Sequence, residues 1–193
     1  MKDQQLVKFL IFFFVIFIVL KYIYFNDTNL IYIKSKKDED FHLVQNLSNK
    51  HKAADMMAMI KDRIELLINY LKKTYPNEPR ILRLFNKFNE NNIQETNLND
   101  KGTSYSIDKG KQINLCLRNK SNSEIHKINI LMFVTLHELA HIMSKSFGHN
   151  NEHDVNFKFI LKNAIKIGIY NNVNYSENKT EFCGMIVDNS PLF

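Results

Sequence analysis

The sequence predicts an α+β fold that is mainly helical, contains a small β-hairpin or sheet, and is preceded by one apolar helix. Three observations predict it: apolar residues that recur every three or four positions, two short alternating segments around a turn, and an apolar run near the amino end. The part of the chain after that run, residues 41–193, is long enough for one domain with its own core.

The apolar run covers residues 6–25 and reads LVKFLIFFFVIFIVLKYIYF, with Lys8 and Lys21 as its only charged residues. Lysines near the ends of such a run can reach the headgroups, so its length suits a transmembrane helix in contact with the lipid bilayer. A cleavable signal peptide is the competing interpretation, but no small-residue cleavage site follows. We therefore expect an uncleaved anchor after a short tail, residues 1–5. The lysines that follow the run slightly favour a cytoplasmic orientation of the domain.

The segment after the anchor begins with a polar tether, residues 26–40, and continues with two predicted helices. Residues 41–75 have helical spacing, and Pro76 ends the pattern. A shorter helix is predicted over 80–88, and residues 89–103 show no periodicity. The recurring apolar positions of the first helix are Leu43, Leu47, Ala54, Met57, Ile60, Ile64, Leu67 and Leu71.

A β-hairpin is predicted next. Residues 104–107 and 112–117 are two short predicted strands, and the sequence DKGK between them is typical of a turn. After the central helix discussed below, a further helix begins near Val155 and ends before Gly168. A short strand is possible at residues 185–187.

The motif HELAH, residues 137–141, lies in an apolar run over 128–147 that contains no Gly or Pro. On a helix, His137 and His141 are one turn apart and point the same way, so both imidazoles can bind one Zn²⁺. Glu138 lies beside them and can take a proton from a zinc-bound water. Burying these three side chains is costly unless they are satisfied, and one zinc ion per chain with its water satisfies all three.

A catalytic zinc needs a third protein ligand and an open fourth position. Gly148 can end the helix and let the chain turn back, and His149 follows at once. His153 lies in the first turn of the next helix and can also reach back. Both histidines therefore remain candidates on the residues alone, with His149 preferred.

Composition argues against a nucleic-acid partner. The formal net charge is +6, but the basic residues are scattered among acidic ones and form no basic patch. The chain has two cysteines, Cys116 and Cys183, which form either one disulfide or two buried thiols.

HELAH followed by GHNNEHDVNFKFIL resembles the active-site region of the WLM and SprT-like zinc metallopeptidases. The chain is more similar still to small metallopeptidase-like proteins of large double-stranded DNA viruses. The resemblance implies a zincin-like domain over residues 41–193, with His137, His141 and His149 as zinc ligands and Glu138 as general base. The family has an aromatic residue where this chain has His153.

Two hypotheses about function follow. The first is a membrane-anchored zinc peptidase that acts on peptides or proteins at a viral or host-cell membrane. The second is a catalytically inactive, zinc-binding or structural membrane protein. In the first, the strand over 112–117 lines the cleft and pairs with an extended substrate. The candidates for an oxyanion donor are Tyr170, Tyr175 and Arg118.

Overall fold

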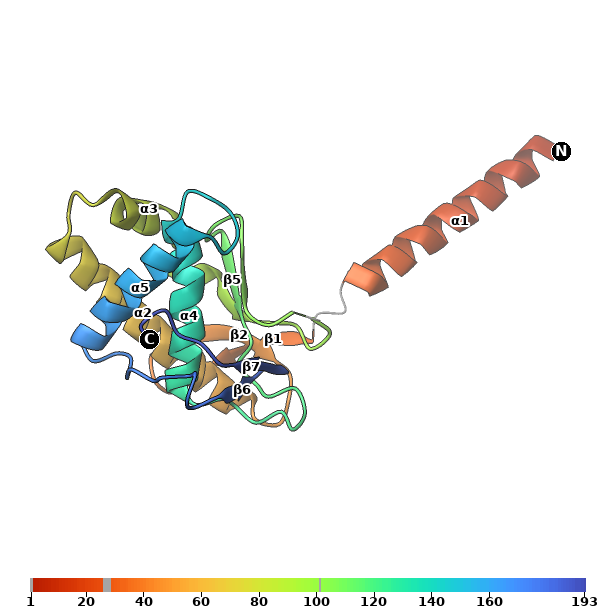
Figure 1. Cartoon of the computed structure of the whole chain (residues 1–193). Helices are drawn as coiled ribbons and strands as arrows, with labels where there is room; N and C mark the ends of the chain where they lie inside the picture. The colour runs from red at the N-terminus through yellow and green to blue at the C-terminus, as the bar shows by residue number, and fades with distance from the viewer. Residues whose placement is uncertain (1, 26–28, 101) are drawn as a thin grey trace.

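The structure is a computed structural model that describes residues 2–25, 29–100 and 102–193. Helices alternate with three small sheets, which confirms the α+β class (Figure 1). The helices are α1 (Lys2–Phe25), α2 (Lys50–Thr74), α3 (Pro79–Lys87), the 3-10 turn η1 (Glu90–Asn92), α4 (Ile128–Met143) and α5 (Asn151–Lys166). The strands are β1 (Leu30–Lys34), β2 (Phe41–Gln45), β3 (Ile93–Glu95), β4 (Tyr105–Ile107), β5 (Gln112–Leu115), β6 (Thr180–Phe182) and β7 (Met185–Val187).

The apolar run at the amino end forms α1, whose described large apolar side chains are exposed, apart from the half-buried Ile16. Among the described residues, however, no helix is both long and apolar enough to cross a membrane. The structure therefore does not support the transmembrane prediction for residues 6–25.

The segment predicted as a polar tether contains a strand instead. β1 pairs with β2 in an antiparallel hairpin, with Leu30 opposite Gln45 and Lys34 opposite Phe41. The predicted helix consequently begins at Lys50 rather than at Phe41. The spacing of apolar residues just after Phe41 fits a strand as well as a helix, and pairing with β1 decides between the two.

The prediction of α2 and α3 is otherwise confirmed. From Ala54 onward, each recurring apolar position of α2 is buried in the core. α3 agrees with the predicted range to within one residue at each end and begins with a proline, which suits a first helical turn. These two helices form part of the core against which α4 packs.

The predicted hairpin forms a three-stranded sheet with a strand that the sequence did not reveal. The strand order is β3-β5-β4, in which β3 is parallel and β4 antiparallel to β5. β3 lies in the stretch that shows no periodicity, because a three-residue strand is too short to display an alternating pattern. β5 is the central strand, and β4 lies at the edge.

α4 runs through the middle of the core (Figure 1) and is buried on nearly every side. It ends at Met143, earlier than the predicted end near Phe147. The carbonyl groups at its end accept hydrogen bonds from cationic side chains, with Arg83 bonded to Met143 and Lys109 bonded to Ser144. Cations at this position also interact favourably with the helix dipole.

A disulfide between Cys116 and Cys183 joins the segment after β5 to the turn between β6 and β7. The two alternatives that the sequence left open are therefore resolved in favour of one bridge. β6 and β7 form an antiparallel hairpin that includes the short strand predicted at residues 185–187.

A buried ion pair ties the sheet to the first hairpin. The Nε of Arg118 donates to Oε1 of Glu95 at 2.7 Å, and both side chains are almost completely buried. The other carboxylate oxygen of Glu95 accepts from the backbone N–H of Gln45 at 2.7 Å. The guanidinium also donates to the side chain of Asn49 at the start of α2. Arg118 thus connects β2, β3 and α2.

Arg118→Ala should lower the free energy of unfolding by about 3–5 kcal/mol, because it leaves the Glu95 carboxylate buried without its partner. Urea denaturation followed by circular dichroism measures the loss. The control is Lys111→Ala, which removes an exposed pair with Asp108 whose nitrogen and oxygen lie 3.8 Å apart. It should cost less than about 1 kcal/mol. Equal losses in the two variants would contradict a structural role for the buried pair.

Candidate metal centre and cleft

α4 positions three polar side chains of the motif at one wall of a cleft. His137 and His141 are one helical turn apart, and their ring centroids lie 4.9 Å apart. Glu138 follows His137 and is only 5% exposed. The rest of α4 is apolar and packed on nearly every side, so the helix cannot rotate to expose these groups without uncovering the core.

The loop between α4 and α5 brings a third histidine back over the helix. Gly148 has a φ of 79°, the left-handed conformation that glycine adopts at little cost. Asn150 caps α5 by accepting from the backbone N–H groups of Glu152 and His153. The Glu152 carboxylate accepts from the backbone N–H of Lys145 at 2.8 Å. Held at both ends, the loop directs His149 toward α4.

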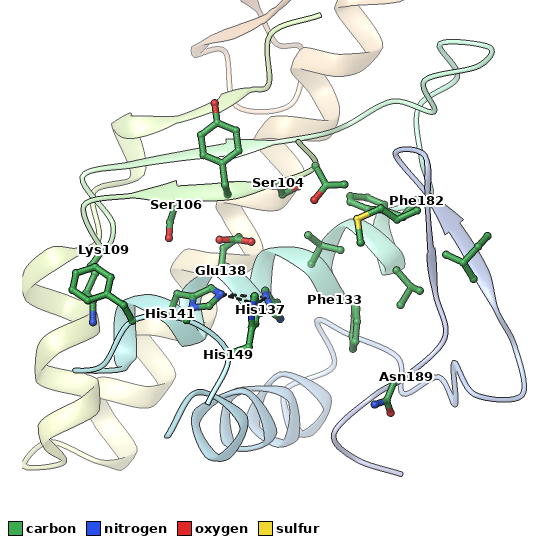
Figure 2. A pocket seen from close by; sticks show the side chains of 18 of the residues that line it. Ser104, Ser106, Lys109, Phe133, His137, Glu138, His141, His149, Phe182 and Asn189 are labelled. Carbon is green, nitrogen blue, oxygen red and sulfur yellow. Dashed lines mark hydrogen bonds between the residues drawn. The ribbon is translucent and has the colours of Figure 1, made fainter. Parts of the chain in front are cut away.

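The Nε2 atoms of three histidines converge on one point. His137 and His149 are 2.8 Å apart at these atoms, and each lies 3.2 Å from the Nε2 of His141 (Figure 2). Nitrogens that share one tetrahedral zinc at 2.0–2.1 Å lie about 3.3 Å from one another. The spacing of the three imidazoles therefore fits a single zinc ion.

Hydrogen bonding alone cannot satisfy this triangle. Each neutral Nε2 atom carries either a hydrogen or a lone pair, so in a group of three at least one pair must face like with like. A cation that accepts three lone pairs removes the conflict. Burial and the neighbouring histidines also lower the pKa of His137 to about 3 and that of His141 to about 4. Both rings are therefore neutral at pH 7, which metal binding requires.

His153 lies behind the triangle and is 1% exposed. Its ring packs on that of His141 at 4.0 Å between centroids, inclined by 34°. Its Nε2 lies 3.4 Å from the backbone carbonyl oxygen of His137. The four histidines nevertheless place one potential ligand atom each within 4.8 Å of one another. The ring of His153 thus packs against the rings of the three converging histidines.

The carboxyl group of Glu138 points away from the core and toward β4 (Figure 2). Burial raises its pKa to about 7, and hydrogen bonds from the backbone N–H and hydroxyl of Ser106 oppose this rise. Glu138 can therefore both hold and release a proton near neutral pH. Ser106 was not among the candidates from the sequence, since a serine in a short strand carries no distinctive signal.

The histidines and Glu138 lie in a cleft of about 570 Å³, a size typical of ligand sites. Figure 2 shows Lys109 at one end of this cleft and Phe182 and Asn189 at the other. Its walls come from β4, α4, the loop before α5 and the β6–β7 hairpin. Segments far apart in the sequence therefore surround the three imidazoles.

The prediction that residues 112–117 line the cleft is wrong. β4 lines it instead, and no residue from Gln112 to Leu117 belongs to the described lining. β5 is paired on both sides and buried, whereas β4 pairs with β5 alone among the described residues and leaves its other edge open. Sequence order does not distinguish the central strand of a sheet from its edge.

Lys109 fastens the β4–β5 turn to the end of α4. Its ammonium group donates to the carbonyl oxygens of Ser144 at 2.9 Å and Ser146 at 2.8 Å. The same group lies 4.2 Å from the ring centroid of Phe147, a distance suited to a cation–π interaction. This contact holds the edge strand against the helix that carries the motif.

The three candidate oxyanion donors do not lie in the cleft. Tyr170 and Tyr175 are each 2% exposed, and Tyr175 packs on Phe133 at 4.7 Å between ring centroids. Arg118 is bound to Glu95. None of the three is part of the described lining. All three side chains are part of the buried interior of the protein.

No family model matches the chain. Among solved structures, the crystal structure of Wss1 from Saccharomyces cerevisiae is similar, with 18% identity and a TM-score of 0.49. That similarity covers 64% of this chain and 85% of the yeast chain.

Among curated proteins, an uncharacterized protein of Invertebrate iridescent virus 6 is 34% identical over 113 residues, which are 58% of this chain and 62% of that protein. An uncharacterized protein of Acanthamoeba polyphaga mimivirus is 36% identical over 165 residues. This second similarity covers 83% of this chain and 84% of the mimivirus protein. The chain therefore belongs to the viral protein family that includes this mimivirus protein.

Proposed function

We propose that this protein is a zinc-dependent peptidase. In this proposal, His137, His141 and His149 hold one zinc ion, and Glu138 is the general base. The observation that carries the proposal is the convergence of three Nε2 atoms, 2.8 to 3.2 Å apart, beside the cleft. The proposed activity does not depend on the role of α1.

The donor set suits a catalytic zinc. Three neutral imidazoles are ligands that zinc accepts, and three protein ligands leave a fourth position for water or substrate. Zinc bound there would polarise the carbonyl of the peptide bond and lower the pKa of a bound water to about 7.

Glu138 has the position and the proton affinity of a general base. Its carboxylate accepts a proton from the attacking water and passes this proton to the nitrogen of the departing amine. Burial raises the pKa of this carboxyl group, which strengthens it as a proton acceptor. Hydrogen bonds from Ser106 keep the carboxyl group turned into the cleft.

The open edge of β4 offers a docking site for an extended peptide. A peptide that pairs with this edge passes over Glu138, since Ser106 in the middle of the strand bonds to that residue. Main-chain pairing of this kind supplies affinity without requiring a particular sequence. Peptides and unfolded protein segments are therefore the proposed substrates.

The alternative is a catalytically inactive protein with a structural zinc. His153 is the observation that favours this alternative, because a fourth histidine so close to the others could close the coordination shell. Against it, the Nε2 atom of His153 faces the carbonyl oxygen of His137, and a structural site has no use for Glu138. The catalytic proposal accounts for both residues.

The purified full-length protein should contain close to one zinc per chain by elemental analysis. His149→Ala should weaken zinc binding by several kcal/mol, because it removes a ligand from a three-ligand site. His153→Ala serves as the matched control and should cost about 10–100-fold in affinity, the usual effect of a residue that supports a ligand. Competition with a fluorescent chelator measures both changes. A larger loss in His153→Ala would move the third ligand to that residue.

Glu138→Gln should retain zinc and abolish peptide hydrolysis, because an amide cannot accept the proton. A peptide library analysed by mass spectrometry detects turnover, and thermal unfolding shows whether the fold is kept. Glu65→Gln is the control, since this glutamate of α2 is exposed and lies outside the cleft. Turnover by Glu138→Gln at the wild-type rate would rule out this residue as the base.

A further inference from the structure

One end of the cleft is an apolar wall built by the β6–β7 hairpin. Phe182 pairs with Met185 and Thr180 pairs with Val187, so Phe182, Met185 and Val187 share one face of the hairpin. All three line the cleft. Met185 is 54% exposed, so this wall presents apolar surface that no part of the described chain covers.

α4 supplies the opposite side of this apolar end. Phe133 and Val134 line the cleft one helical turn before His137 and Glu138, on the same faces of the helix. One turn corresponds to about 5.4 Å along the helix. An extended peptide advances about 3.3 Å per residue. If the peptide bond to be cleaved lies beside Glu138, the side chain of an adjacent residue therefore reaches the apolar end of the cleft.

We propose that this apolar end is a specificity subsite for a large apolar side chain, such as Phe or Leu, directly beside the cleaved bond. The inference deepens the proposed peptidase function and rests on it. Phe182, Met185 and Val187 on the hairpin and Phe133 and Val134 on α4 would surround that side chain. Removing its surface from water should favour it over alanine by at least about tenfold.

The direction of β4 assigns the subsite to one side of the bond. In Figure 2 the chain runs from Ser104, on the side of Phe182, through Ser106 to Lys109 at the far end. A peptide that pairs antiparallel to β4, the slightly more stable arrangement, runs toward the hairpin. The apolar side chain then belongs to the residue on the carboxyl side of the cleaved bond.

A disulfide and contacts with His126 fix the position of the β6–β7 hairpin, and therefore of the apolar wall that it forms. The disulfide attaches Cys183 in the turn to Cys116. The backbone N–H of Cys183 also donates to Nε2 of His126 at 3.3 Å, and the ring of His126 lies 4.9 Å from that of Phe182. We therefore expect reduction of the disulfide to loosen the subsite and weaken its selectivity.

The experiment compares peptides that differ only in one residue, Phe or Ala. Binding is measured by fluorescence anisotropy on zinc-loaded Glu138→Gln protein, and cleavage sites are mapped by mass spectrometry on zinc-loaded wild-type protein. We expect the Phe peptide to bind at least about tenfold more tightly and to be cleaved on the amino side of Phe.

Met185→Asp should bring the ratio of the affinities for the Phe and Ala peptides close to one. Leu66→Asp is the matched control, at a residue of α2 that is 52% exposed and outside the cleft, and should keep the ratio.

The outcomes separate the subsite from the peptidase function. Equal affinity for both peptides, or an unchanged ratio in Met185→Asp, overturns the subsite even if peptides are cleaved. Cleavage on the carboxyl side of Phe overturns the assigned side. A Phe preference in binding without hydrolysis by the wild-type protein supports the subsite and overturns the peptidase function. If Met185→Asp does not fold, Met185→Ser and phosphine-reduced wild-type protein test the same ratio.

Discussion

The burial of α4 is the constraint on which the rest of the structure depends. α4 is apolar on nearly every side and lies in the middle of the core, and it carries two imidazoles and a carboxyl group with it. Polar groups in such a position are costly unless they are satisfied. In the rest of the fold, one side of α4 faces a cleft, which these polar groups line, and the other sides are packed. The gathering of the histidines, the burial of Glu138 and its raised pKa all follow from that placement.

The loop just after α4 adds the Nε2 atom of His149 to those of His137 and His141. Lys109 binds the carbonyl oxygens at the helix end, and Glu152 binds the backbone N–H groups on the other side of the same loop. With both its donors and its acceptors engaged, the loop has few alternatives to the conformation that turns His149 inward. His153 fills the space beneath the rings. The positions of the three Nε2 atoms therefore depend on contacts that the loop makes elsewhere, with Lys109 and Glu152.

Two walls of the cleft come from the β4–β5 and β6–β7 hairpins. β4 contributes an open strand edge, and β6–β7 contributes an apolar face fixed by the disulfide at Cys183. One wall is suited to main-chain hydrogen bonds and the other to side-chain burial. A peptidase can combine these two modes, with the first giving affinity for any extended chain and the second giving selectivity. The buried pair between Glu95 and Arg118 supports this arrangement by joining β2, β3 and α2.

The sequence by itself determined the α+β class, the helices α3 to α5 to within a few residues, most of α2, the β4–β5 hairpin and the placement of His137 and His141 on one face of a helix, because helical periodicity and turn residues act over neighbouring positions. It also named His149, although it left His153 as an alternative. Only the tertiary structure decided that residues 30–34 pair with β2, that β4 rather than β5 lines the cleft, that Cys116 bonds to Cys183, and that Arg118 serves the core. Apart from the β1–β2 hairpin, these features join residues that are distant along the chain. Such contacts leave no local pattern, since their partners are chosen by which surfaces remain to be buried once the helices have packed.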